Sequence, residues 1–228
     1  MYKQRSTLLK TLETTKLFYD IYPYKIDLRL QLAPIFREKK FGYTREVLDY
    51  IQLDYELGRP LIWRKGYRTT EPLEINSFLD AKLFFNICQS LNYEDYKLRV
   101  EQSHLALYTK EYSIVDKIKN LMHDKVVSIH EPNKQVDLKP NTIYTEKPIE
   151  YEYKVTLGNK VNPGAGKWIE NNPSLIKAGQ ICIENIKNDG YTQGFYIFAK
   201  NEKVLNLLSI ALGGNIKRVD KYINITQS

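Results

Sequence analysis

One apolar pattern occurs twice in this chain of 228 residues, at a constant spacing of 90 residues. The first copy runs from 105 to 129 and the second from 195 to 219. In each copy a strand-like alternation leads into a helical spacing and then into a second strand. The pattern predicts two folding units of one kind, although two unrelated strand-helix-strand units would also satisfy it. The aligned pairs include Leu107 and Ile197, Lys110 and Lys200, and Ile118 and Leu208.

Strand and helix signals on either side of these copies favour an α+β fold. Residues 24–30 and 151–157 alternate apolar and polar side chains, as a strand with one buried face does. The apolar stripe of residues 44–57 ends at Gly58, with Pro60 beyond it, which predicts a helix. A capping box at Ser77 predicts the start of another helix. Further helices are expected within 174–187 and 204–212, and further strands at 96–101, 194–200 and 216–223.

We therefore expect an α+β protein of two ferredoxin-like (β-α-β type) repeats. A length of 228 residues suits two modest domains of about 100 to 150 residues each. The first repeat spans 1–140 and carries a helical basic insertion at about 36–68. The second repeat, at 146–228, is shorter and lacks that insertion. The polar, proline-containing segment 130–141 is the predicted linker.

Several classes of protein are disfavoured by what the sequence lacks. No run approaches the roughly 20 apolar residues of a membrane helix, and no apolar signal core follows Met1, so we expect a cytoplasmic protein with no membrane partner. Cys88 and Cys182 lie in helical apolar patterns and are expected to be buried reduced thiols, with a disulfide in an oxidising compartment as the alternative. The three histidines have no metal-ligand spacing, so we predict no metal and no cofactor.

Basic residues gather in the first third of the chain. Residues 1–68 hold 14 Lys or Arg against 8 Asp or Glu, within a net charge of +7. Two stretches, 36–45 and 59–68, interleave cations with rings, which suits phosphates and unpaired bases. The alternative is that the cations are solvated and Trp63 covers the core. The predicted phosphate contacts are Arg37, Lys39, Lys40, Arg59, Arg64, Lys65 and Arg68, and the predicted stacking rings are Trp63 and Tyr67.

Two segments match nucleotide-binding motifs only in part. Gln193–Phe198 shares the Gly-Phe start of the aromatic strand in RNA-recognition modules, but its apolar pattern favours a buried strand. Residues 158–167 form a Gly-rich turn between a predicted strand and a predicted helix. A phosphate loop would need Gly where Val161 stands and Ser or Thr where Trp168 stands. We expect a simple strand-to-helix turn there.

Three segments of the second half carry a resemblance to known sequences. Tyr151–Leu157, Trp168–Pro173 and Asn201–Leu208 resemble uncharacterised proteins of large contractile-tailed phages of aquatic bacteria. The resemblance covers mainly the second half, and no functional residue can be transferred through it. It implies a phage-encoded protein that acts in the cytoplasm of an infected bacterium or belongs to the virion.

The favoured function is a non-enzymatic accessory protein that binds nucleic acid, with single strands preferred. No catalytic residue is predicted, because no catalytic signature is present. One alternative is a protein-interaction or virion structural protein built from tandem α+β repeats. A second alternative is a metal-dependent nuclease with dispersed carboxylates such as Asp27, Asp80 and Glu101.

Overall fold

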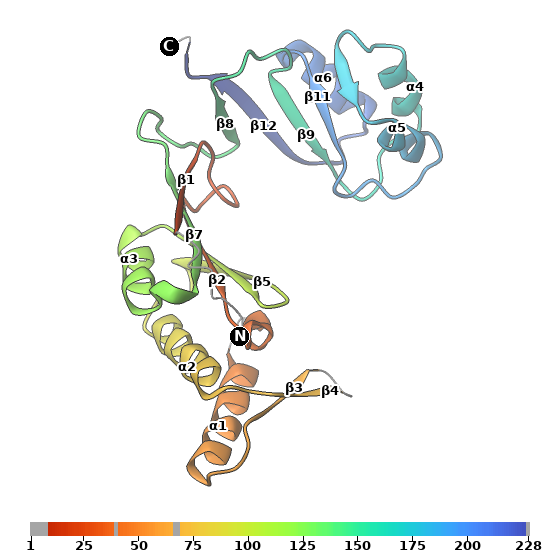
Figure 1. Ribbon diagram of the computed structural model, residues 1–228. Helices are drawn as coiled ribbons and strands as arrows, with labels where there is room; N and C mark the ends of the chain where they lie inside the picture. The colour runs from red at the N-terminus through yellow and green to blue at the C-terminus, as the bar shows by residue number, and fades with distance from the viewer. Residues whose placement is uncertain (1–8, 39–40, 66–68, 227–228) are drawn as a thin grey trace, which may run out of the picture. The chain divides into compact units, whose positions relative to one another are not determined.

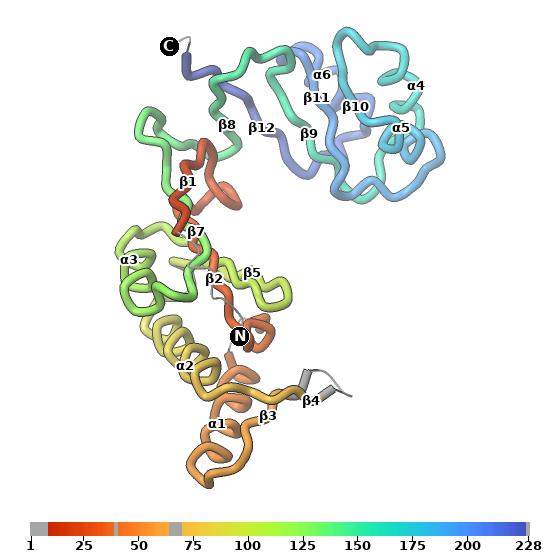
Figure 2. The backbone as a smooth tube through the Cα atoms, in the orientation of Figure 1, coloured from red at the N-terminus to blue at the C-terminus, as the bar shows by residue number. Residues whose placement is uncertain are grey.

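The computed structural model describes residues 9–38, 41–65 and 69–226. Within them the fold is mixed α+β, with two five-stranded sheets and six α-helices (Figure 1). The chain divides into two compact units, and its course between them can be followed in Figure 2. Unit 1 comprises Met1–Thr14 and Ile21–Pro132, and unit 2 comprises Thr15–Asp20 and Asn133–Ser228. The chain therefore enters unit 2 briefly after the first strand, returns to unit 1, and enters unit 2 again after Pro132.

The sheet of unit 1 has the strand order β1-β7-β2-β6-β5. Strand β1 is parallel to β7, whereas each of the other neighbouring pairs is antiparallel. Alternation along β2 buries Ile26 and Leu28 on one face and leaves Lys25 and Asp27 on the other. The strands are β1 (Lys10–Thr14), β2 (Tyr24–Arg29), β5 (Tyr96–Glu101), β6 (His104–Thr109) and β7 (Val126–Pro132).

Helices α2 (Ile75–Gln89) and α3 (Tyr112–Leu121) contribute buried apolar residues to the unit 1 core. A short 3-10 turn, η2 (His123–Lys125), leads from α3 into β7. Phe84 of α2 is fully buried and its ring meets that of Phe36 edge-on, with centroids 5.1 Å apart. Between β2 and α2 the chain adds η1 (Ala33–Arg37), α1 (Gly42–Glu56) and a hairpin of β3 (Ile62–Lys65) and β4 (Thr69–Pro72).

The sheet of unit 2 has the order β10-β11-β9-β12-β8. Strand β8 is parallel to β12, and the other neighbours are antiparallel. Three helices cover one face, and the apolar residues of sheet and helices form a second core. The strands are β8 (Thr142–Thr145), β9 (Tyr153–Leu157), β10 (Ile176–Ala178), β11 (Tyr196–Ala199) and β12 (Ile216–Asn224), and the helices are α4 (Gly164–Glu170), α5 (Gln180–Lys187) and α6 (Glu202–Ala211).

The two sheets have the same order and the same pairing directions. In each unit the four strands after the parallel edge strand are arranged 4-1-3-2 when numbered along the chain. The registers also correspond: Ile26 of β2 lies between Ile129 and Leu107, as Val155 of β9 lies between Val219 and Ile197. The spacing of 90 residues in the sequence thus relates positions that occupy equivalent places in the two sheets.

The structure corrects three local predictions. Helix α2 begins at Ile75 without a side-chain cap, so Ser77 lies within the helix and the capping-box prediction is wrong. The single helix predicted within 174–187 is instead β10 followed by α5, because Ile176–Ala178 pairs with β11 and Gly179 is extended. Part of the Gly-rich turn at 158–167 is helical, since α4 starts at Gly164.

Residues 15–20, which we call the strap, belong to unit 2, and polar contacts of Thr15 and Asp20 tie them to its other segments. The amide of Tyr144 donates to the carbonyl of Thr15 at 2.9 Å. One carboxylate oxygen of Asp20 accepts from the amide of Asn141 at 3.0 Å and lies 2.8 Å from Nη2 of Arg218. Asp20 has a left-handed backbone, with φ of 61°, a conformation that Asp and Asn tolerate better than most residues. Asp20 therefore joins the strap to two other segments of unit 2.

Replacing Asp20 with Asn tests the strap. The amide keeps the acceptor oxygen and the tolerance of left-handed backbone but removes the charge that faces Arg218. We expect a loss of about 1 kcal/mol in the stability of unit 2, the difference between charged and neutral hydrogen bonds. Urea unfolding would measure it. Asp189→Asn is the control, because Asp189 and Lys160 are an exposed pair of little expected value. Equal effects of the two changes would contradict a special role of Asp20.

Candidate nucleic-acid interface

The structure describes only some of the residues that were predicted to bind nucleic acid. Arg37 and Arg59 are exposed, and Arg59 lies 3.4 Å from a carboxylate oxygen of Asp54. The backbone of Arg64 and Lys65 belongs to β3. Lys39, Lys40, Tyr67 and Arg68 lie outside the described residues.

Trp63 is a core residue. Its side chain is only 6% exposed, and it belongs to the buried apolar cluster of unit 1. Stacking on a base requires an accessible ring face. The arrangement agrees with the alternative interpretation of Trp63, in which the ring covers the core.

Helix α1 separates the two basic stretches and is itself acidic. It carries one arginine, Arg45, against four carboxylates at Glu46, Asp49, Asp54 and Glu56. A phosphate backbone that followed the helix would meet these carboxylates, and like charges repel. The basic block predicted at residues 36–68 is therefore interrupted by the acidic residues of α1.

A different group of side chains gathers on the sheet face of unit 2 that its helices leave open. Strand β11 buries Ile197 and Ala199 in the core, so Tyr196 and Phe198 point to the opposite face. Tyr196 is 49% exposed and Phe198 is half-buried. The prediction of a buried strand at Gln193–Phe198 holds for one side only: alternation buries Ile197 and Ala199, and aromatic rings lie on the other side.

Four rings are in contact on this open face. Phe198 is central: its ring centroid lies 5.4 Å from that of Tyr196, 6.3 Å from that of Tyr222 and 6.4 Å from that of Tyr151. The four come from β11, β12 and the segment before β9. We call these rings, together with Lys154 and Lys177, the aromatic face.

Strand register places the two lysines beside the rings. Lys177 of β10 and Lys154 of β9 are both opposite Phe198, one on each side of it. The Nζ of Lys154 lies 4.4 Å from the centroid of the Tyr196 ring. A cation over an aromatic ring is favourable, and the lysine stem lets the charge move to another acceptor. The aromatic face thus combines rings with mobile positive charge.

Arg218, at the edge of the aromatic face, is held by two carboxylates. Its guanidinium lies 2.8 Å from Asp20 and 2.5 Å from Asp220. Burial raises the pKa of Tyr222, and the nearby Asp220, itself buried, and Tyr196 raise it further. The Tyr222 hydroxyl therefore stays neutral at ordinary pH. Arg218 orders this edge but is neutralised by its partners.

The equivalent face of unit 1 carries a polar cluster in place of rings. One carboxylate oxygen of Asp27 accepts from Ser128 at 2.7 Å and lies 2.8 Å from Nζ of Lys25 and 3.3 Å from Nε2 of His130. Burial and the charge of Lys25 lower the pKa of His130, although Asp27 opposes them. In a nucleophilic triad one histidine nitrogen faces the serine and the other faces the carboxylate, whereas here Nε2 of His130 faces both, 3.5 Å from Ser128 Oγ and 3.3 Å from Asp27. The cluster has the geometry of a structural network.

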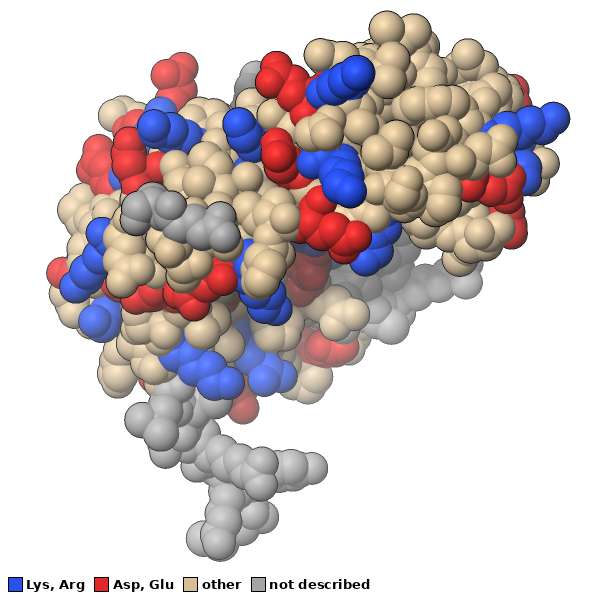
Figure 3. Space-filling model, turned by 90° about the horizontal axis from the view of Figure 1, so that it is seen from above, with Lys and Arg blue, Asp and Glu red and all other residues tan. Residues whose placement is uncertain are grey.

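Other features of the described residues bear on the alternatives. Among them no group of three or more His, Cys, Asp or Glu side chains is placed to hold a metal ion. In the same part of the chain no helix is both long and apolar enough to cross a membrane. Figure 3 shows blue and red side chains interspersed over the face in view, with no continuous basic area there. The chain matches no protein-family model, no curated protein and no solved structure.

Proposed function

We propose that this chain is a non-enzymatic protein that binds single-stranded nucleic acid on the aromatic face of unit 2. The observation that carries the proposal is the contact of four rings on an open sheet face, with Lys154 over Tyr196. Bases of a single strand present ring faces that a duplex hides, and stacking on aromatic side chains accepts any base. The predicted preference follows from this chemistry.

Both units are proposed to be ferredoxin-like repeats that arose by duplication. The shared 4-1-3-2 strand order, the matching pairing directions and the equivalent registers support this proposal. The parallel edge strands β1 and β8 and the helix α5 between β10 and β11 are additions to that core. Sheets of this kind in RNA-recognition modules stack bases on the face without helices.

In the proposed mode each component has one task. Tyr196, Phe198 and Tyr222 stack on bases, and each stacked base contributes about 1–3 kcal/mol to the binding free energy. Lys154 and Lys177 neutralise phosphates and release condensed counterions, which makes the affinity depend on salt. Arg218 keeps its carboxylate partners and fixes the edge of the site.

The basic block of unit 1 has a smaller part in this proposal. Arg37 and Arg59 are exposed and could add phosphate contacts for a longer strand. The acidic residues of α1 limit that contribution. Lys39, Lys40, Arg64, Lys65 and Arg68 stay predicted phosphate contacts, and Tyr67 stays a predicted stacking residue. In this proposal Trp63 does not contact nucleic acid, because its side chain is buried.

Lysine substitution tests the electrostatic part. Lys154→Gln removes one cation beside the rings and should lower the slope of log affinity against log salt by about one. Lys203→Gln is the control, since Lys203 is an exposed residue of α6, on the helical side of the sheet. Fluorescence anisotropy over a salt series measures both. Equal slopes for Lys154→Gln and the unchanged protein would contradict the placement of a phosphate at Lys154.

The class of nucleic acid is tested with nuclease-treated protein and labelled single-stranded RNA, single-stranded DNA and duplex DNA at two salt concentrations. The proposal expects both single strands, or one of them, to bind at least about tenfold more tightly than the duplex, a difference of 1.4 kcal/mol. Binding of duplex alone, or of none of the three at low salt, would overturn it.

A second candidate is a protein-interaction or virion structural role, in keeping with the phage resemblance. The observation that favours it is a pair of exposed isoleucines on the helices of unit 2, Ile181 at 67% on α5 and Ile210 at 78% on α6. They are the two most exposed large hydrophobic residues among those the structure describes, and exposed apolar side chains mark protein interfaces where they form a contiguous patch. A discrete oligomer or partner complex that resists nuclease and moderate salt, and is lost in Ile210→Glu, would favour this role.

A further inference from the structure

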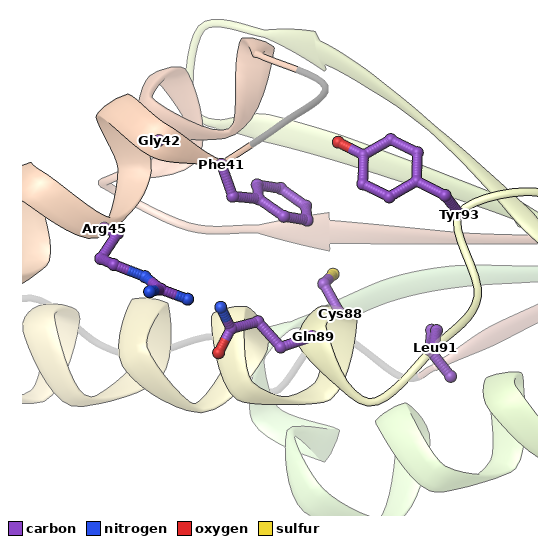
Figure 4. A pocket seen from close by; sticks show the side chains of 7 residues that line it. All are labelled: Phe41, Gly42, Arg45, Cys88, Gln89, Leu91 and Tyr93. Atoms are coloured by element: carbon purple, nitrogen blue, oxygen red, sulfur yellow. The ribbon is translucent and has the colours of Figure 1, made fainter.

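A pocket of about 530 Å³ opens in unit 1 between the first turn of α1 and the last turn of α2 (Figure 4). Sites for small molecules commonly enclose about 300–1,000 Å³. The rings of Phe41 and Tyr93 line one side, with centroids 6.1 Å apart, and Cys88 and Leu91 line the other. The pocket is therefore large enough for a small ligand and has aromatic and apolar walls.

Two polar side chains converge at the mouth of this pocket from facing helices. Arg45 comes from α1 and Gln89 from α2, and Figure 4 shows their polar ends directed toward each other. Among the described residues neither side chain has a hydrogen bond or an ion pair. A guanidinium without a carboxylate partner is well suited to bind a carboxylate or phosphate through two parallel hydrogen bonds.

Among the described residues, a buried hydroxyl without a partner belongs to Tyr96, whose ring is next to the Tyr93 ring of the pocket wall. The hydroxyl of Tyr96 is fully buried and has no hydrogen-bond partner in the described structure. Its ring lies next to that of Tyr93, with centroids 5.9 Å apart, and burial, Cys88 and Tyr93 all raise its pKa. The hydroxyl is therefore a neutral, buried group next to the pocket wall, and Tyr96 does not itself line the pocket.

The pocket continues along the groove between the two helices. A second hollow of about 350 Å³ shares Arg45 and Gln89 with the first and extends toward Gln52 and Lys82. The Nζ of Lys82 donates to Gln52 at 2.8 Å, so this end is polar. A ligand held at Arg45 can therefore carry a polar extension.

We propose that this pocket binds a small aromatic anion. Its ring system packs against Phe41 and Tyr93, and its carboxylate or phosphate pairs with Arg45 while Gln89 donates a further hydrogen bond. Ring packing and the charged bond are both needed, because an exposed guanidinium alone binds anions weakly. The site lies in unit 1 and is independent of the aromatic face, which belongs to unit 2.

The first test measures calorimetric binding of four probes: 1-naphthyl phosphate, 1-naphthoate, 1-naphthol and inorganic phosphate. One or both aromatic anions should bind with a stoichiometry of one, at least about tenfold more tightly than naphthol or phosphate. The tighter of the two identifies the preferred anion. Arg45→Gln should weaken binding of that probe by about tenfold, whereas Arg29→Gln, at an exposed arginine of β2 outside the pocket, should change it by less than about twofold. Failure of both aromatic anions to bind at millimolar concentration would overturn the proposal.

The two free cysteines give a second readout in the unmodified protein. Both are buried, and only Cys88 lines the pocket, whereas Cys182 lies in the core of unit 2. With iodoacetamide and mass spectrometry, the bound probe should slow alkylation of Cys88 severalfold and leave Cys182 unchanged. Equal protection of both, or of neither at saturating probe, would show that the probe binds elsewhere and would overturn the proposal.

Discussion

Replacement of both Tyr196 and Phe198 by alanine should weaken binding of single strands by at least about tenfold. Stacking contributes about 1–3 kcal/mol per base, so each ring alone accounts for roughly a 5- to 150-fold change. The two rings touch each other, so we expect the double change to cost less than the sum of the single changes. Anisotropy at one fixed salt concentration measures all three variants.

Salt dependence separates stacking from charge in these variants. Removal of rings leaves Lys154 and Lys177 in place, so the slope of log affinity against log salt should stay unchanged while the affinity falls. Tyr191→Ala is the matched control, because Tyr191 is a 60%-exposed tyrosine of unit 2 that makes no contact with the four rings. Equal losses in Tyr191→Ala and Tyr196→Ala, or no loss in the double variant, would remove the aromatic face from the proposed function.

Ring substitution should not compromise the fold, so the binding result can be interpreted. Tyr196 is half-exposed, and neither Tyr196 nor Phe198 belongs to the buried core, which instead contains Ile197 and Ala199 of the same strand. Exposed strand positions have stability effects of a few tenths of a kcal/mol to about 1 kcal/mol. Urea unfolding of the same samples would show whether the fold is preserved.

Sequence periodicity identified many of the helices and strands that have one apolar face, while the strands β1, β3, β4 and β8 were not predicted. Leu107 and Ile197 lie 90 residues apart and occupy equivalent places in the two sheets, because a strand with one buried face needs apolar residues at alternate positions. The short β10 was missed, since three residues cannot show an alternation that differs from a helical stripe. The strap could not be predicted either, because the partners of Asp20 are 121 and 198 positions along the chain at Asn141 and Arg218.

The candidate site was harder to read from sequence than the fold. Interleaved cations and rings such as those at residues 59–68 occur both on exposed surfaces and at the edge of a core. Whether Trp63 is buried depends on contacts with segments that are distant in the sequence. The aromatic residues Tyr196 and Phe198 could be seen within the predicted strand Gly194–Lys200, but the apolar character of that segment by itself favours a buried strand. Only the placement of helices on one side of the sheet decides which residues of β11 are open.

Replacement of Trp63 by alanine should destabilise unit 1 by about 3–5 kcal/mol, as large-to-small changes of buried Trp or Phe do. Trp63 is 6% exposed in a cluster that also contains Leu73 and Phe78, so its removal leaves a cavity that the β3–β4 hairpin can only partly close. Urea unfolding followed by circular dichroism measures the loss. Trp168→Ala is the control for removal of an indole, because Trp168 is partly exposed and packs on the other core, in unit 2.

A second variant at this position, Trp63→Phe, separates the two accounts of Trp63. If the ring is a core residue, Trp63→Phe should recover most of the stability, because it restores most of the buried apolar volume. It should also bind single strands within about twofold of the unchanged protein, less than the loss of one stacked base. A stable Trp63→Phe protein whose affinity for single-stranded nucleic acid falls by about tenfold or more would instead return Trp63 to the binding surface, and with it the basic block at 36–68. Because Trp63 lies in unit 1 and the aromatic face in unit 2, this comparison also determines which unit binds the strand.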